Sequence, residues 1–136
     1  CVLPGRTPDM EQDLREAQKL RYEAPGYFLA DAASRLGCTV YCYRFDWRAL
    51  ESEFGACHCI ELPFVFGNLD AWNAPMLKGA SKTEMERLSV EMQGMWCRFF
   101  RFETPGEDVW PEYKPALPAV KCFDNGQNPV VHKRMG

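Results

Sequence analysis

The 136-residue sequence lacks a long hydrophobic run, a run of like charge and any low-complexity tract. No apolar stretch approaches the roughly 20 residues that a membrane-spanning helix needs. Acidic and basic residues are interleaved and the formal net charge is −3, so the charge pattern favours neither nucleic acid nor an anionic membrane as a partner. Residues 1–6 show no basic region followed by an apolar core, so we recognise no signal peptide, although a cut chain would have lost one.

The cysteines do not form the even, dense framework of a small disulfide-rich scaffold. There are seven of them, an odd number, at Cys1, Cys38, Cys42, Cys57, Cys59, Cys97 and Cys122. Cys42 and Cys97 fall within apolar patterns, where a thiol behaves as a small hydrophobic group. We therefore expect a reducing, cytoplasmic compartment, with secretion left open.

The order of the expected elements indicates the α/β class. Hydrophobic residues make up 46% of a chain of single-domain size, which is enough for a packed core. Helical spacing predicts helices over 8–22 and 27–36, separated by a break at Ala24-Pro25-Gly26, and a strand follows Gly37 over 39–45. Helix, glycine and strand make half of a βαβ unit, whose leading strand would lie before residue 1. The strand is apolar almost throughout, as in an inner strand.

The second half of the chain carries the longest expected helix. Ser81 and Glu84 fit a capping box, and an apolar stripe continues to about residue 102. The stripe consists of Leu88, Met92, Met95, Trp96, Phe99 and Phe100. Gly94 within it suggests close packing, since a helical glycine otherwise costs about 1 kcal/mol. Residues 119–123 are expected as an edge strand, 124–126 as a turn and 129–136, with His132, as a frayed polar tail.

His58 is the candidate catalytic residue, one of only two histidines, in the segment 55–69. Small neighbours let the loop approach a pocket, and an apolar segment follows, so His58 suits the role of a general base. Taken alone, a histidine is more often structural than catalytic. Cys57-His58-Cys59 lacks the spacing of a structural zinc site, and Cys38 and Cys42 could add ligands only if the strand ended there, so no metal or cofactor is expected.

Four segments, in order, resemble the C-terminal part of type B carboxylesterases, the family of bacterial para-nitrobenzyl esterases and, more distantly, cholinesterases. They are Tyr43-Arg44-Phe45-Asp46-Trp47, the stretch from Gly55 through His58 to Leu69, the helix with Trp96 and Phe99, and Trp110-Pro111-Glu112-Tyr113. The resemblance runs from about Ala24 to Asp124. It implies an α/β-hydrolase fold and a hydrolase, a serine esterase that cleaves small carboxylic esters with a catalytic triad.

The resemblance places His58 at the family's triad histidine, the last triad member along the chain. It also implies that Gly55, Ala56, Cys59 and Glu61 support the histidine loop. We interpret Glu61 as a buried, hydrogen-bonded carboxylate rather than the triad acid, which precedes the histidine in this family. Cys59 departs from the family pattern, which has glycine or alanine there, and this puts the loop geometry in doubt.

The other parts of an esterase site are missing from the sequence. No Gly-x-Ser-x-Gly motif is present, since Gly79-Ala80-Ser81-Lys82-Thr83 lacks the second glycine, and the glycine-rich oxyanion loop is absent. We expect residues 1–136 to be a fragment, the C-terminal part of a single α/β-hydrolase domain, incomplete and inactive alone. Its partners would be an ester substrate and the N-terminal remainder. The alternative is a non-catalytic, cholinesterase-like binding domain or a truncated product.

Overall fold

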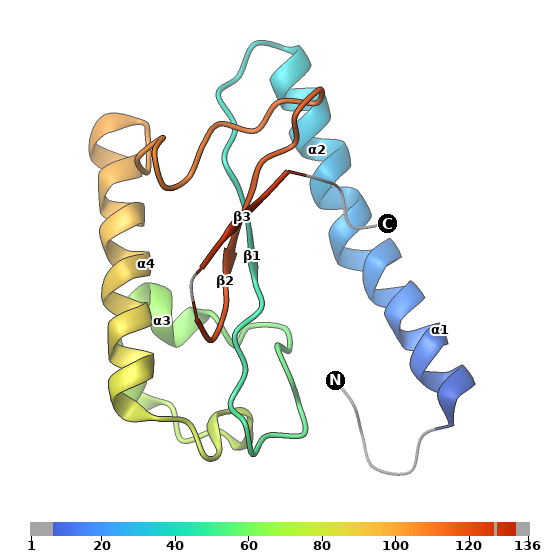
Figure 1. Ribbon diagram of the computed structural model, residues 1–136, viewed down its shortest axis with the longest axis vertical. Helices are drawn as coiled ribbons and strands as arrows, with labels where there is room; N and C mark the ends of the chain where they lie inside the picture. Colours follow the sequence, from blue (N-terminus) through green and yellow to red (C-terminus); the bar gives the residue numbers. More distant parts are fainter. Residues whose placement is uncertain (1–6, 127, 133–136) are drawn as a thin grey trace.

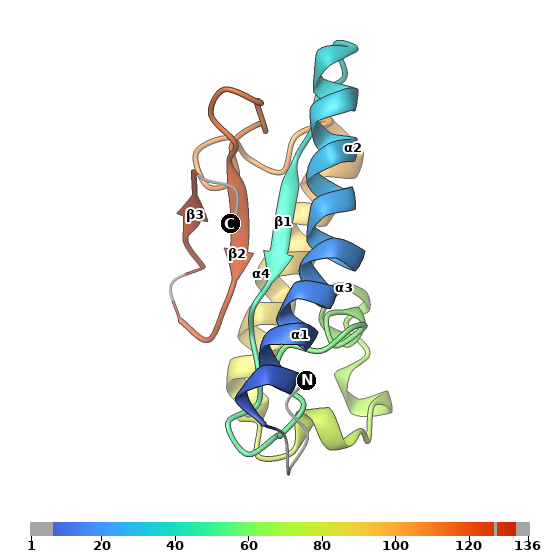
Figure 2. The ribbon, with the colours of Figure 1, turned by 90° about the vertical axis from the view of Figure 1, so that its right-hand side faces the viewer.

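The computed structural model describes residues 7–126 and 128–132, and its elements form three layers (Figures 1 and 2). A small sheet lies between a long helical arm on one side and two helices on the other. The arm consists of α1 (Pro8–Gln18), the π-helical turn η1 (Lys19–Glu23) and α2 (Ala24–Arg35). The other layer holds α3 (Leu62–Phe66) and α4 (Lys82–Phe102), joined by the short 3-10 turns η2 (Leu69–Ala71) and η3 (Pro75–Leu77).

The expected break at residues 24–26 does not occur, because the arm stays helical across it. At its start, the Met10 amide donates to the Thr7 hydroxyl over 3.4 Å. Pro25 has no N–H to offer an α-helical turn, and the chain widens into a π turn instead of ending. In this turn the Ala24 amide donates to the Lys19 carbonyl, five residues earlier. Gly37, at φ +84°, follows α2 as predicted.

The sheet has three strands in the order β1-β2-β3. β1 (Cys42–Phe45) pairs in parallel with β2 (Val120–Phe123), and β2 pairs antiparallel with β3 (Val130–Val131). The prediction that the second strand is an edge strand is wrong: β2 is buried throughout and paired on both sides. β3 forms from the start of the tail expected to fray, and residues 133–136 of that tail lie outside the described part. β1, expected as an inner strand, is half-buried and is at one edge of the strands described.

Helix α4 follows its predicted bounds but differs in detail. The Ser81 hydroxyl accepts from the Glu84 amide over 3.4 Å, whereas the Glu84 carboxylate accepts from the Trp47 indole N–H over 3.0 Å, so only half of the capping box forms. Phe100 is 75% exposed, so the stripe is narrower than predicted. Gly94 has no atom within 4 Å of where a Cβ would lie, which contradicts its expected role in close packing.

The core lies between the sheet, α3 and α4, and it fixes the loop before α3. Phe64 of α3 is fully buried, with its ring centre 4.9 Å from that of Trp47. Its carbonyl accepts from the Ser89 hydroxyl over 2.7 Å and from the Gln93 amide over 3.3 Å. These bonds tie α3 to α4 and so anchor the segment 55–61. No helix in the described ranges has the length and apolar character needed to cross a membrane.

Candidate active site

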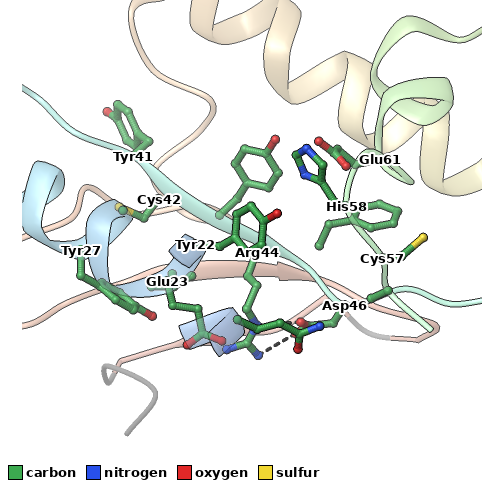
Figure 3. Close-up of a pocket in the computed structure, with 16 residues that line it drawn as sticks. Tyr22, Glu23, Tyr27, Tyr41, Cys42, Arg44, Asp46, Cys57, His58 and Glu61 are labelled. Atoms are coloured by element: carbon green, nitrogen blue, oxygen red, sulfur yellow. Dashed lines mark hydrogen bonds and ion pairs between the residues drawn. The ribbon is translucent and has the colours of Figure 1, made fainter. Parts of the chain in front are cut away.

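A large pocket opens between the helical arm, β1 and the loop that carries His58 (Figure 3). Its volume is about 930 Å³. The arm contributes Tyr22, Glu23 and Tyr27; β1 and the residue after it contribute Tyr43, Arg44 and Asp46; the loop contributes Ala56, Cys57, His58 and Glu61. The pocket therefore brings His58, Ala56 and Glu61 together, three of the site residues predicted from the sequence.

His58 is exposed at this pocket, and its imidazole stacks on the ring of Tyr22. The two ring centres are 5.3 Å apart and the planes are inclined by 27°. An accessible imidazole beside an open volume can exchange a proton with a bound molecule, as a general base requires. Among the described residues the imidazole has no hydrogen-bond partner, so the stack with Tyr22 is its main restraint.

The loop reaches the pocket through two residues in the left-handed region. Gly55 has φ +60°, which costs a glycine little, whereas Cys59 has φ +69° and carries a Cβ in that conformation. The Ile60 amide donates to the Cys57 carbonyl and the Leu62 amide to the Cys59 carbonyl, each over 3.2 Å. Along these tight turns His58 is exposed whereas Ile60, two residues later, is buried. Gly55 and Cys59 thus shape the loop.

Glu61 ends the loop and begins α3. Its carbonyl accepts from the amides of Phe64 and Val65, each over 3.0 Å. The carboxylate is half-buried, lies on the same side of the pocket as His58 (Figure 3), and has no hydrogen-bond partner in the part of the chain that the structure describes. Burial, followed by the charge of Glu61, raises the pKa of Tyr43. Glu61 supports the loop through its backbone in this structure.

Arg44 and Asp46 form a bidentate ion pair in the pocket, with two hydrogen bonds of 2.6 Å each. The hydrogen bond to Asp46 is the main cause that raises the pKa of the Arg44 guanidinium. Asp46, the residue after β1, is thus held at the strand end by Arg44. Arg44 Nη1 and Glu23 Oε2 are buried without a hydrogen-bond partner among the described residues. The pocket therefore holds one donor and one acceptor that can still form hydrogen bonds.

The sequence did not predict that residues of the helical arm line the pocket. Tyr22 and Glu23 belong to η1, whereas the sequence predicted that a helix ends at Tyr22, just before the expected break at 24–26. The available signal was Pro25 inside an otherwise continuous helical period, which also fits a π turn. Elsewhere, Cys97 is exposed rather than core, and Cys1 lies outside the described residues. No three His, Cys, Asp or Glu side chains converge as a metal site within 7–126 and 128–132.

Comparisons with known proteins agree on one family. Residues 11–134 match the model of the carboxylesterase family. The chain is 34% identical over 107 residues to the para-nitrobenzyl esterase of Bacillus subtilis (strain 168), covering 76% of this chain and 22% of that protein. It is 31% identical over 102 residues to a probable N-octanoylanthranilate hydrolase, AqdA2, of Rhodococcus erythropolis, covering 74% of this chain and 22% of that protein.

Solved structures give the same result for the fold. The carboxylesterase EST55 of Geobacillus stearothermophilus superposes with a TM-score of 0.77 at 29% identity, covering 96% of this chain and 27% of that one. A structure of a para-nitrobenzyl esterase gives 0.76 at 30% identity, with 89% and 24% covered. The chain thus spans about a fifth of the length of the curated relatives it matches.

Proposed function

The chain belongs to the carboxylesterase family and has a part of the α/β-hydrolase fold, and from this we propose that it is part of a serine esterase in which His58 is the general acid–base. The observation that carries the proposal is the exposed imidazole at the mouth of a large pocket, in the segment that resembles the family's histidine loop. The substrate class is small carboxylic esters. The para-nitrobenzyl esterase among the relatives supports this class.

The chemistry assigned to His58 is proton transfer. The imidazole accepts the proton of a serine hydroxyl as the serine oxygen attacks the ester carbonyl, and it then gives this proton to the departing alcohol. In the second half it takes a proton from water, which attacks the acyl-enzyme, and returns it to the serine. The serine and the acid that orients the imidazole would come from the remainder of the enzyme, upstream of this chain.

We also propose that residues 1–136 form the C-terminal part of a single domain, with the N-terminal remainder as their partner. Several large apolar side chains support this, because water surrounds them in the chain alone: Phe28 is 77% exposed, Leu36 84% and Phe100 75%. The complete enzyme means below the protein that contains both parts. The mass of the protein purified from its natural source tests the proposal, and a mass equal to this chain alone would contradict it.

Replacing His58 tests the proposed function. In the complete enzyme, His58→Ala should lower kcat for a chromogenic short-chain ester by about 10⁴-fold or more, since the serine loses its proton acceptor. His132→Ala is the matched control, because His132 is the other histidine and lies exposed outside the pocket. It should leave turnover unchanged.

Unchanged turnover in His58→Ala would overturn the catalytic role. The alternative, a binding domain without catalysis, requires that the wild-type protein hydrolyse no ester and that its upstream sequence lack a serine at the Gly-x-Ser-x-Gly position. The two measurements therefore separate an enzyme with a different base from a protein with no esterase chemistry.

A further inference from the structure

Tyr22 is the only aromatic residue of α1 and η1, and its ring meets the histidine loop 36 positions further along the chain. We propose that Tyr22 is a positioning residue for His58: the π turn delivers its ring against the imidazole and limits the orientations that the imidazole can take. This inference rests on the proposed function, because it needs His58 to be the proton carrier.

The π turn explains how the ring arrives there. An α-helix turns by about 100° per residue, so a turn with one extra residue shifts the register of the two helical segments that it joins by about that angle. The i to i+5 bond from the Ala24 amide to the Lys19 carbonyl marks this extra residue, and Tyr22 lies inside the turn. Single π turns of this kind are frequent at functional sites. Here it gives Tyr22 a direction that the regular helix would not.

The stack has the geometry of an attractive ring pair. Its centre-to-centre distance of 5.3 Å falls in the range preferred by offset stacks. When His58 takes up a proton, the same ring face lies close enough to favour the resulting cation. The Arg21 guanidinium lies 5.6 Å from the centre of the Tyr22 ring, a second contact that restrains the ring.

Within the part of this chain that the structure describes, the acidic side chains of the pocket do not position the imidazole. The carboxylate of Glu61 lies on the histidine side, yet no hydrogen bond joins it to the imidazole among the described residues. Asp46 is engaged by Arg44. Among the described residues that line the pocket, Tyr22 is the one whose ring stacks on His58.

The test compares an aromatic with an aliphatic replacement in the complete enzyme. Tyr22→Leu removes the ring face and should lower kcat for a chromogenic short-chain ester by about fivefold, the size expected of an exposed ring–cation contact, with KM within about twofold. Tyr22→Phe keeps the face and should restore most of the kcat lost in Tyr22→Leu. Phe28→Leu is the matched control, because it removes a ring from the same arm at a residue that does not line the pocket.

Each kcat is expressed per active site, counted from the burst of the acylation step, so that loss of folded enzyme does not count as loss of rate. If Tyr22→Leu gives no titratable enzyme, Tyr22→Met takes its place. Equal kcat in the Leu and Phe variants, with His58→Ala inactive, overturns the role of Tyr22 alone. Full activity in His58→Ala overturns the proposed function, and the inference with it.

Discussion

The two faces of the sheet are covered in different ways (Figure 2). On the side of α3 and α4, large apolar side chains are fully buried, among them Phe64, Leu88 and Met92. On the side of the arm, α2 buries only Ala30, and its anchor is polar: the Tyr113 hydroxyl donates to the Asp31 carboxylate over 2.8 Å. One face is held by a core and the other by a few directed contacts.

The packed face supports the loop that carries His58, and the open face leaves that loop accessible. The packed face fixes α3 and thereby the end of the histidine loop, as a rigid scaffold does for a functional loop. The open face leaves a volume of about 930 Å³ in which His58 and Tyr22 meet. The role proposed for His58 needs both kinds of face, one that admits a substrate and one that holds the base in place.

The largest expected effect contrasts the anchors of the two faces. In the complete enzyme, Phe64→Ala should lower the free energy of unfolding by about 3–5 kcal/mol, because a fully buried ring leaves a cavity. Tyr113→Phe removes only the hydroxyl that bonds Asp31 and should cost about 1–3 kcal/mol. Urea denaturation measures both. Equal losses would break the comparison, since the arm would then be held as strongly as α4.

Local patterns predicted the packed face well. The apolar stripe and Ser81 cap define α4 because i, i+3, i+4 spacing and capping act within a few residues. The strand before Asp46 and the turn at 124–126 were also predicted, the latter confirmed by the Gly126 amide donating to the Asp124 carboxylate over 2.8 Å. His58 lines a pocket, as its small neighbours suggested.

The open face depends on contacts that local patterns do not encode. β3 pairs with the second edge of β2, and beside this pairing the Cys122 amide donates to the Pro129 carbonyl over 2.8 Å. The π turn depends on where Pro25 falls relative to the helical register, and the partner of Tyr22 lies 36 residues away. The left-handed Cys59 depends on the turns on either side of it.

The reactivity of the Cys42 thiol reports how far water reaches into the arm side of the sheet. Burial, and secondarily the charge of Asp31, raises the pKa of Cys42 to about 11. At pH 9 its thiolate fraction should be about fiftyfold smaller than that of an ordinary thiol, so alkylation in the complete enzyme should be slower by about that factor. Exposed Cys97 on α4 is the internal control, and peptide mass spectrometry reads both rates. Equal rates would show that water reaches the arm side freely.

The raised pKa of Cys42 also makes the free energy of unfolding depend on pH. The folded state keeps the Cys42 proton that an unfolded thiol releases above pH 9, so this contribution is present below about pH 9 and is lost as the pH rises through about 11.

Alkylation without reductant also counts the free thiols of the protein. The six described cysteines are free in the structure. Thiols that alkylate only after reduction would contradict the reducing compartment expected from the sequence.

The smallest expected effect tests whether any segment packs against the exposed side of α4. Gly94 is exposed on α4 with open space where a Cβ would lie, so Gly94→Ala should raise the free energy of unfolding by about 0.5–1 kcal/mol through helix propensity. Gly67→Ala is the opposite case, because Gly67 has φ +64° and a Cβ there would overlap the Gln93 side chain. It should cost at least about 1 kcal/mol in the same urea experiment. A destabilising Gly94→Ala would mean that, in the complete enzyme, another segment packs closely on this side of α4, as the sequence pattern first suggested.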